Sequence, residues 1–195
     1  MAEFPAIAEY AFLSDCEVNA LVAPDGAVEW LCLPRPDAPS VFGAVLDRSA
    51  GFFHFGPSTA RIPDQRRYLP GTNVLETTFH TASGWMTLTD LLVIGPESTQ
   101  ARRNGWRRVP EERVAQCTLL RLATCVDGRI EIEANCLPLF DYGRTPGVWS
   151  YEGDGYERLQ VRCGDLSLQL RGSMRLGAVG ARAYGRASLE KGETA

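Results

Sequence analysis

The stretch Val74–Ile94, VLETTFHTASGWMTLTDLLVI, decides the fold class of this chain. Apolar and polar side chains alternate along it, so that Leu75 and Phe79 share one face and Glu76 lies on the other. Alternation with a period of two is typical of a β-strand, because successive side chains point to opposite faces of a sheet. The turn residues Ala82-Ser83-Gly84 divide the stretch into two such runs. The pattern therefore predicts an antiparallel hairpin.

The same alternation recurs further along the chain. Residues 116–126 and 130–136 form two runs joined by Asp127-Gly128, the strongest short hairpin signal in the sequence. Two more runs, 159–163 and 166–170, flank the turn residues Gly164 and Asp165. We therefore expect a second and a third antiparallel hairpin.

Helical patterns are scarce in this sequence. The 19 glycines and 12 prolines are spread along the chain, and no window keeps apolar residues at i, i+3, i+4 and i+7 over three turns. The residues Ser40–Leu46 are the one place where we expect a short turn of helix. Many short strands between turn signals predict an all-β fold, an antiparallel sandwich of two sheets with little helix.

Two segments stand apart from the alternating pattern. Residues 98–113, STQARRNGWRRVPEER, are polar and rich in arginine, which predicts a long exposed connection, with a binding patch as the alternative. The tail, residues 187–195, has the pattern of the approach to a further strand. We therefore expect residues 1–195 to form a single β-sandwich domain that is truncated near its last strand.

The composition limits the classes of partner. The 195 residues are 45% hydrophobic and 23% charged, as in a folded globular domain. The formal net charge of −4 argues against a nucleic acid or an anionic membrane recognised through charge, and a neutral ligand fits better. The sequence has no run of about 18 apolar residues that could span a membrane, and its N-terminus lacks the basic residues of a signal peptide. We expect a cytoplasmic protein.

The cysteines and histidines give little support to a metal site. Six cysteines are scattered without a CxxC pair, at Cys16, Cys32, Cys117, Cys125, Cys136 and Cys163. Most lie in apolar, strand-like runs, so we expect reduced, buried thiols rather than disulfides. The two histidines, His54 and His80, lie far from any pair of cysteines in the sequence. We therefore expect neither a metal ion nor another cofactor.

Common catalytic motifs are missing from the sequence. It contains no G-x-S-x-G, H-E-x-x-H, Walker or dinucleotide-binding motif, so hydrolase triads, zinc proteolysis and nucleotide binding have no support. Most of the Asp and Glu residues on alternating strands are expected to face solvent. Without geometry, none of them can be assigned as a general acid or base.

The most informative stretch for function is Trp30–Phe42. Its phrase PRPDAP predicts a stiff loop, because each proline restricts the backbone. Arg35 offers a guanidinium fork and Asp37 a carboxylate, while Trp30 or Phe42 offers an aromatic ring. These groups hydrogen-bond to a sugar and stack on it. The alternative is that Arg35 and Asp37 form an ion pair that only holds the turn.

Several phrases, taken together and in order, resemble one known family. These phrases are FLSDC, ALVAPDGAVEWLCLPRPDAPSVFGAVLD, RRYLPGTNVLETTF, TLTDLL and LFDYGRTP. They resemble the N-terminal domain of the bacterial trehalase-like and glucoamylase-like enzymes of glycoside hydrolase family fifteen. The resemblance runs from about Ile7 to Tyr142 and onward to the Gly-Glu phrase at Gly192, so it covers nearly the whole chain.

The resemblance implies a two-domain enzyme in which a β-sandwich precedes an α/α barrel. The paired glutamates of the inverting mechanism belong to that barrel, where one protonates the glycosidic oxygen and the other activates water. The helical hairpins of such a barrel are absent from these 195 residues. The resemblance therefore implies that this chain alone hydrolyses nothing.

In such enzymes the sandwich packs on the barrel and extends loops toward the mouth of the active site. We expect the stretch Trp30–Phe42 to be one of these loops and Asp141-Tyr142-Gly143-Arg144 to be a second. The residues expected to contact the sugar or to brace the barrel are Trp30, Arg35, Asp37, Ser40, Phe42, Asp141, Tyr142 and Arg144.

Three functional interpretations follow. The leading one is a non-catalytic N-terminal domain of a cytoplasmic α-glucoside hydrolase, with trehalase favoured over glucoamylase, whose partners are its own barrel and a small neutral sugar. The second is a free-standing carbohydrate-binding sandwich, which would need exposed aromatic rings in a row; Trp85, Trp106 and Trp149 are too dispersed in the sequence to decide this. The third is an assembly module completed by a barrel or, as a homodimer, by a second copy.

Overall fold

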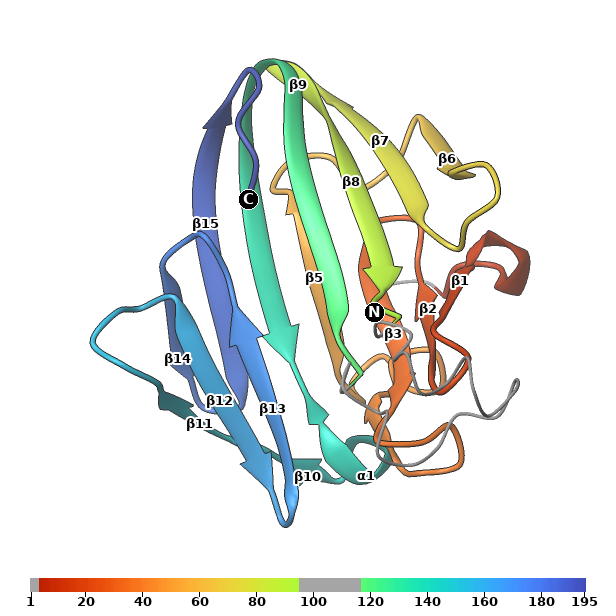
Figure 1. Cartoon of the computed structure of the whole chain (residues 1–195), viewed down its shortest axis with the longest axis vertical. Helices are drawn as coiled ribbons and strands as arrows, with labels where there is room; N and C mark the ends of the chain where they lie inside the picture. The colour runs from red at the N-terminus through yellow and green to blue at the C-terminus, as the bar shows by residue number, and fades with distance from the viewer. Residues whose placement is uncertain (1–3, 95–116) are drawn as a thin grey trace, which may run out of the picture.

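The computed structural model describes residues 4–94 and 117–195 of the chain. It is an antiparallel β-sandwich with little helix, which confirms the fold class predicted from the sequence (Figure 1). The arginine-rich segment 98–113, predicted as an exposed connection, lies outside the described residues.

One sheet, here termed the long sheet, collects strands from both ends of the chain. Its members are β1 (Ala11–Ser14), β2 (Asn19–Val22), β3 (Ala27–Cys32), β4 (Ser40–Phe42), β5 (Phe52–Pro57), β9 (Leu119–Leu137), β14 (Leu176–Val179) and β15 (Arg182–Glu190). The order is β1-β2-β3-β5-β9-β15-β14, with β4 paired to β3. The second half of β9 therefore lies at the centre of this sheet.

The second sheet contains the hairpin on which the prediction of fold class rests. Its strands are β6 (Gln65–Tyr68), β7 (Leu75–Thr81), β8 (Gly84–Leu92) and the first half of β9. The strands β7 and β8 pair antiparallel, with Phe79 opposite Met86. The predicted hairpin over residues 74–94 is therefore confirmed.

A third, smaller sheet follows β9 in the chain. It contains β11 (Val148–Tyr151), β12 (Arg158–Cys163) and β13 (Leu166–Arg171), in that order, after the two-residue strand β10 (Thr145–Pro146). The strands β12 and β13 pair antiparallel, with Val161 opposite Leu168. This confirms the hairpin predicted over residues 159–170.

The long strand β9 connects the two large sheets, and here the predicted pairing is wrong. Residues 119–128 pair with β8, whereas residues 129–136 pair with β15 and residues 132–137 pair with β5. The chain does turn back at Gly128, whose φ is 74°, and Figure 1 shows two arms running from this turn. The first arm lies between β8 and the C-terminal residues, and the second arm lies between β5 and β15, so the arms do not pair with each other. The predicted hairpin is therefore an arch between two sheets.

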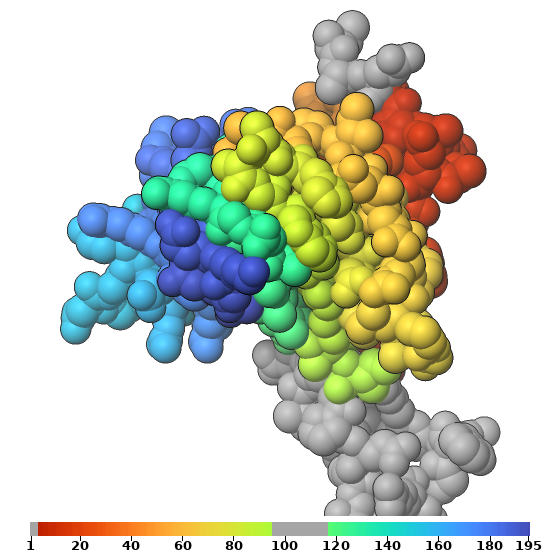
Figure 2. Space-filling view, turned by 90° about the horizontal axis from the view of Figure 1, so that it is seen from above, coloured from red at the N-terminus to blue at the C-terminus, as the bar shows by residue number. Residues whose placement is uncertain are grey.

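The C-terminal residues also pass from the long sheet to the second sheet. Residues 187–190 belong to β15, and the chain then turns at Gly192, whose φ is 85°. The last residues bond to the first arm of β9, where Ala123 and Ala195 exchange two backbone hydrogen bonds of 2.9 Å. In Figure 2, which looks at the arch from above, the dark-blue C-terminal residues lie against the green of β9. The tail thus contributes to both sheets.

The core lies between the two large sheets. Phe79, Met86 and Leu88 from the second sheet face Ile130 and Ile132 from the long sheet, and all five side chains are fully buried. Burial of such side chains is the main favourable contribution to folding, about 1.5–3 kcal/mol for each large one. The arch at Gly128 allows β9 to supply apolar side chains to both walls of this core.

Three of the six cysteine side chains are buried. Cys32, Cys125 and Cys136 are buried, as the sequence predicts, whereas Cys16 is exposed. Burial raises the pKa of Cys136 to about 12, so this thiol is neutral at physiological pH. These buried thiols behave as small apolar side chains.

The short turn of helix expected at residues 40–46 is wrong for residues 40–42. Residues 43–47 do form a hydrogen-bonded turn, in which the carbonyl of Gly43 accepts from the N–H groups of Leu46 and Asp47. Ser40, Val41 and Phe42 form strand β4, which pairs with β3, and all three are buried. Pairing with β3 provides backbone partners for these buried residues, which a single exposed helical turn would not do. The helices assigned among the described residues are a 3₁₀ turn, Ile7–Glu9, and α1, Phe140–Gly143, in which Asp141 and Tyr142 have left-handed backbone angles.

Candidate functional site

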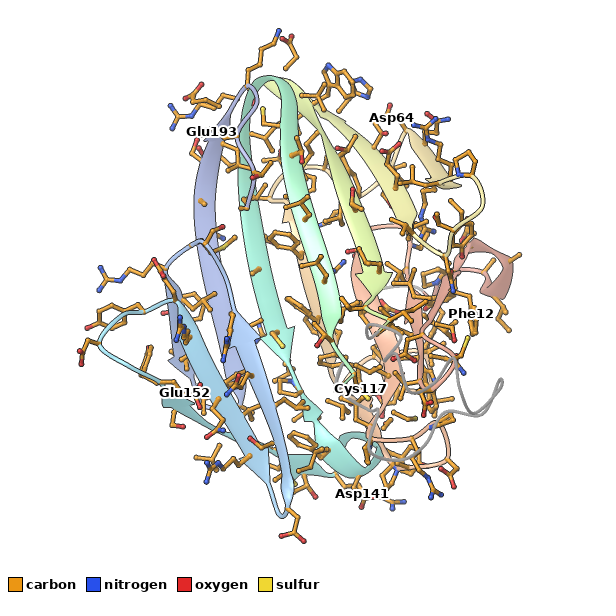
Figure 3. The ribbon with its side chains drawn as sticks, viewed as in Figure 1. Phe12, Asp64, Cys117, Asp141, Glu152 and Glu193 are labelled. Carbon is orange, nitrogen blue, oxygen red and sulfur yellow. The ribbon has the colours of Figure 1, made fainter. Side chains whose placement is uncertain are left out.

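The two loops predicted to form an interface lie at the same end of the sandwich. The loop between β3 and β4 and the turn α1 both lie at the lower edge in Figure 1, and α1 contacts β4. Figure 3 labels Asp141 at this edge. This end of the molecule, residues 33–39 and 140–144, is termed the loop end below.

The segment that follows β4 passes beneath α1 and supports it. Gly143 lies directly against Ala50, and Ala50 accepts a hydrogen bond of 3.0 Å from the backbone N–H of Gly43. Asp141 and Tyr142 both have left-handed backbone angles, with φ of 51° and 58°. Such angles are uncommon for residues other than glycine and persist where the surrounding packing holds them. This packing turns Tyr142 outward, where it is 45% exposed.

Arg35 and Asp37 form an ion pair on the surface of the loop end. Arg35 Nε donates a hydrogen bond of 2.8 Å to Asp37 Oδ1, and its Nη2 donates another to Oδ2. Both side chains are about two-thirds exposed, at 64% and 65%. The guanidinium holds the pKa of Asp37 below its ordinary value. The ion pair expected as the alternative is therefore present, and it lies open to solvent.

The other predicted residues of the first loop lie deeper. Ser40 and Phe42 are buried, and Trp30 is half-buried. They support the loop from beneath, and only Arg35 and Asp37 of this group present most of their side chains to solvent.

The second predicted loop presents its polar residues to solvent. Arg144 Nη1 lies 3.7 Å from Asp141 Oδ2, and the two side chains are 75% and 48% exposed. Within the described ranges, no hydrogen bond or ion pair joins this loop to Arg35 or Asp37. The loop end is thus two adjacent polar surfaces rather than one bonded cluster.

A buried carboxylate that the sequence interpretation missed anchors the loop end. Glu29 on β3 is 2% exposed, and it accepts a hydrogen bond of 2.6 Å from Arg48 and another from the hydroxyl of Tyr10. Burial and the neighbouring carboxylate raise the pKa of Tyr10. The backbone carbonyl of Glu29 also accepts from Val45, which ties the segment after β4 to β3. The signal was a lone carboxylate in the apolar run AVEWLCL, since a buried charge requires a partner.

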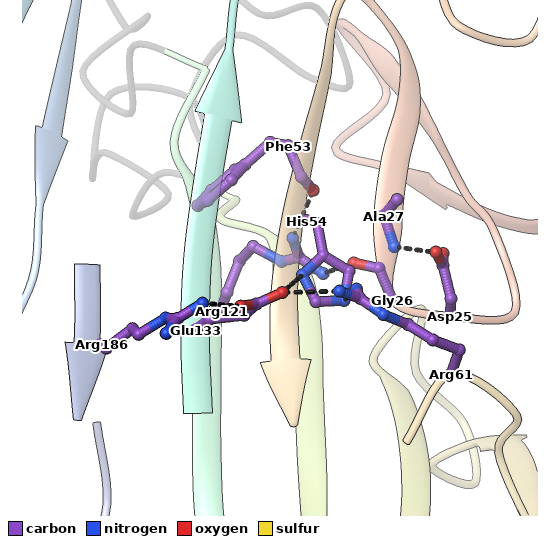
Figure 4. Close-up of polar contacts among 9 residues, drawn as sticks. All are labelled: Asp25, Gly26, Ala27, Phe53, His54, Arg61, Arg121, Glu133 and Arg186. Atoms are coloured by element: carbon purple, nitrogen blue, oxygen red, sulfur yellow. Dashed lines mark hydrogen bonds and ion pairs between the residues drawn. The ribbon is translucent and has the colours of Figure 1, made fainter. Parts of the chain in front are cut away.

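A second polar cluster surrounds His54 on the opposite side of β5 from the core (Figure 4). His54 is 3% exposed, and Arg61 contacts its Nε2. Arg61 also donates a hydrogen bond of 2.6 Å to Glu133, which Arg186 approaches to 3.4 Å. Burial, followed by the positive charges of Arg61 and Arg121, lowers the pKa of His54 to about 3. The imidazole is therefore neutral at physiological pH.

A third buried group connects the two sheets. Arg121 on β9 donates hydrogen bonds of 2.8 Å to Asp90 on β8 and to the carbonyl of Phe53 on β5. It also donates to the carbonyl of Gly26. The side chains of Arg121 and Asp90 are 3% and 0% exposed. This pair is placed to clamp the sheets together rather than to meet a ligand.

The described part of the chain has neither a cluster of metal-ligating side chains nor a helix suited to span a membrane. Residues 4–94 and 117–195 contain no group of three or more His, Cys, Asp or Glu side chains placed to hold a metal ion. None of the helices in these ranges has the length and apolar character needed to cross a membrane.

Comparison with known proteins gives related sequences along nearly the whole chain. Residues 2–111 match the family described as trehalase-like, N-terminal. The chain is 44% identical to the trehalase of Mycolicibacterium smegmatis and 43% identical to that of Mycobacterium tuberculosis, in alignments that cover 97% of this chain and 29% of each relative. Trehalase 1 of Sulfolobus acidocaldarius is 39% identical over 76% of this chain and 22% of its own length. The chain thus spans less than a third of these relatives, and no solved structure matches it.

Proposed function

Since the chain belongs to the trehalase-like N-terminal domain family, we propose that it is the non-catalytic N-terminal domain of an α-glucoside hydrolase of family fifteen. In this proposal the sandwich packs on a catalytic α/α barrel and completes it, and the whole enzyme hydrolyses trehalose by the inverting mechanism. Trehalose is favoured over the substrates of glucoamylase, because the relatives that align with nearly the whole chain are named trehalases.

The observation that carries the proposal is the coverage of the alignments. They include 97% of this chain but only 29% of each mycobacterial trehalase. More than two-thirds of each relative is therefore available for a separate catalytic domain. An all-β chain that aligns with the smaller part of an enzyme fits an accessory role better than a catalytic one.

The chemistry of the carboxylates supports the same conclusion. An inverting glycosidase needs two carboxyl groups about 6.5–9.5 Å apart, one of which must protonate the leaving oxygen while the other activates water. Three carboxylates of the described sandwich are buried. Glu29 and Asp90 are each bonded to an arginine, and Asp15 accepts hydrogen bonds from the backbone of Glu17 and Val18. These bonds hold all three groups inside the fold, where a substrate would not reach them.

The loop end is the surface proposed to meet the barrel and its sugar. Three prolines and the Arg35–Asp37 ion pair stiffen the first loop, so that little conformational entropy is lost when a partner orders it. Arg35 and Tyr142 are exposed on adjacent loops, and both are suited to hydrogen-bond with polar groups of a partner. The buried Glu29–Arg48 pair holds this surface in place from below.

We place the enzyme in the cytoplasm. The buried cysteines Cys32, Cys125 and Cys136 are thiols rather than disulfides, as is usual for proteins of reducing compartments.

The assay of the purified 195-residue chain tests the proposal. We expect no release of glucose from trehalose or from maltose, measured beside the full-length enzyme as a positive control. Turnover of either disaccharide by the purified chain, at a rate that follows its concentration, would contradict the non-catalytic role.

A further inference from the structure

An open groove of about 820 Å³ lies on the long sheet, and none of the residues predicted for the loop end lines it. It is formed where β9, β14 and β15 meet the end of β11, at the left in Figure 1. Three tyrosines line it, namely Tyr151 on β11, Tyr156 in the loop before β12, and Tyr184 on β15. Each is about half exposed, at 48%, 50% and 48%. This surface is termed the tyrosine groove below.

Tyr184 forms the floor of the groove. It lies opposite Gly177 on β14 and opposite Asn135 on β9. A Cβ on Gly177 would approach within 2.9 Å of Cζ of Tyr184, so the ring rests on the bare backbone of the glycine. The ring is thus held flat from below and open from above, which is the arrangement needed for stacking on the apolar face of a ring-shaped ligand.

Contacts within the protein hold the wall of the groove in place without a ligand. The rings of Tyr151 and Tyr156 meet edge to face, with centroids 5.5 Å apart. The guanidinium of Arg175 stacks 4.2 Å from the centroid of Tyr156. The hydroxyl of Tyr151 accepts a hydrogen bond of 3.3 Å from the backbone of Ala178. Contacts of this kind reduce the entropy that a binding site loses on ordering.

Polar groups between the aromatic rings are suited to hydroxyl groups. Asn135 Oδ1 is buried and has no hydrogen-bond partner within residues 4–94 and 117–195. A buried acceptor without a donor is costly, so the Asn135 amide would gain from turning toward a ligand hydroxyl that donates to it. Arg182 also lines the groove and supplies further N–H donors.

The charges favour a neutral ligand over an anion. Three arginines line the groove, but Arg186 approaches Glu133 and Arg175 lies on Tyr156. Of these three, Arg182 alone has neither an ion pair within residues 4–94 and 117–195 nor a contact with an aromatic ring of the groove. Its guanidinium lies 6.0 Å from the ring of Phe52. An anion site would need several guanidinium groups directed at one point.

We propose that the tyrosine groove binds a neutral sugar, with one ring stacked on Tyr184 beside Tyr151 and Tyr156, and a hydroxyl bonded to Asn135. Sugars combine apolar ring faces with hydroxyls at the rim, which matches the alternation of aromatic and polar groups here. This proposal is separate from the proposed packing on a catalytic barrel, because the sandwich would bind the sugar without a catalytic domain.

Isothermal titration calorimetry of the purified chain with trehalose and with maltotriose tests the proposal. We expect saturable binding of at least one of the two sugars. Tyr184→Ala and, separately, Tyr156→Ala should each weaken it by about tenfold, which corresponds to the loss of one aromatic contact. Tyr156 lies in a loop, so its truncation leaves every strand intact. Tyr68→Ala, which removes a ring 43% exposed on β6, should leave the affinity unchanged.

Three results would overturn the proposal. They are no binding of either sugar, binding that both groove variants leave unchanged, and binding of sulfate at the groove in place of the sugars. Hydrolytic activity is not measured in this experiment, so the test stands whether or not the role on a barrel holds.

Discussion

The molecule contains two arginine–aspartate pairs of the same geometry in opposite surroundings. In both, Nε of the arginine lies 2.8 Å from Oδ1 of the aspartate. The side chains of Arg121 and Asp90 are 3% and 0% exposed, whereas those of Arg35 and Asp37 are 64% and 65% exposed. The same bond therefore lies in the core in one pair and on the surface in the other.

The partners of the two arginines explain the difference. Arg121 also donates to the carbonyls of Phe53 and Gly26, so one side chain joins β9 of the second sheet to the long sheet. The guanidinium of Arg35 bonds, within the described part of the chain, to Asp37 alone. A buried pair is costly to break, while an exposed pair adds about 0–1 kcal/mol to stability. We infer that the first pair maintains the fold and that the second serves a partner.

The largest effect is expected from breaking the buried pair. Asp90→Ala would leave the guanidinium of Arg121 buried without its counter-charge, and we expect it to lower the free energy of unfolding by about 3–5 kcal/mol. Urea denaturation of the purified chain measures this. The double variant Asp90→Leu, Arg121→Met should recover part of the loss, because it removes both charges together but leaves the carbonyls of Phe53 and Gly26 without their donor. A single variant that loses less than about 1 kcal/mol would show that the pair does not clamp the sheets.

A smaller effect is expected at the arch that brings Arg121 over the long sheet. A Cβ on Gly128 would lie 2.2 Å from the carbonyl oxygen of Ser83. Gly128→Ala should therefore lower the free energy of unfolding by about 3 kcal/mol, from backbone strain and this contact together.

Gly71 provides a matched control for the arch. Its φ is also 74°, but a Cβ there would meet nothing within 4 Å. Gly71→Ala should lose only the cost of the left-handed backbone, about 1–2 kcal/mol. Equal losses at the two positions, measured by urea denaturation, would mean that the arch is not tightly packed.

The sequence predicted the strands better than their partners. Alternation located β7, β8, β12 and β13, because each pairs with its neighbour across a short turn. It did not distinguish the arch at Gly128 from a hairpin, since Asp-Gly reverses the chain in either case. The actual partners of the second arm of β9, namely β5 and β15, are set by packing between distant segments.

Two features outside the loop end, the buried Arg121–Asp90 pair and the tyrosine groove, were not predicted from the sequence. Asp90 occupies the apolar phase of β8, between Leu88 and Leu92, and Arg121 occupies the same phase of β9 as Ala123. These charged residues among buried positions were a signal that the sequence interpretation did not use. The tyrosine groove had no such signal, because its rings come from β11, a loop and β15, which only the fold brings together. Each of the two loops of the loop end is a consecutive stretch, so both could be located from the sequence, while their role at a barrel stays a prediction.

The exposed pair is expected to contribute least to stability and most to function. In the full-length enzyme, Arg35→Ala should leave the Tm unchanged, because both side chains are largely in solvent. Arg67, which bonds Glu76 on β7 and is 57% exposed, offers a matched control away from the loop end. Arg67→Ala should change neither Tm nor kinetics.

The kinetics of Arg35→Ala in the full-length enzyme test the central claim most directly. The account predicts that kcat/KM for trehalose falls by at least about tenfold, the effect of losing one charge-assisted hydrogen bond of about 1.5–3 kcal/mol. Unchanged kcat/KM together with unchanged Tm would contradict it, because Arg35 would then serve neither the fold nor the catalytic domain.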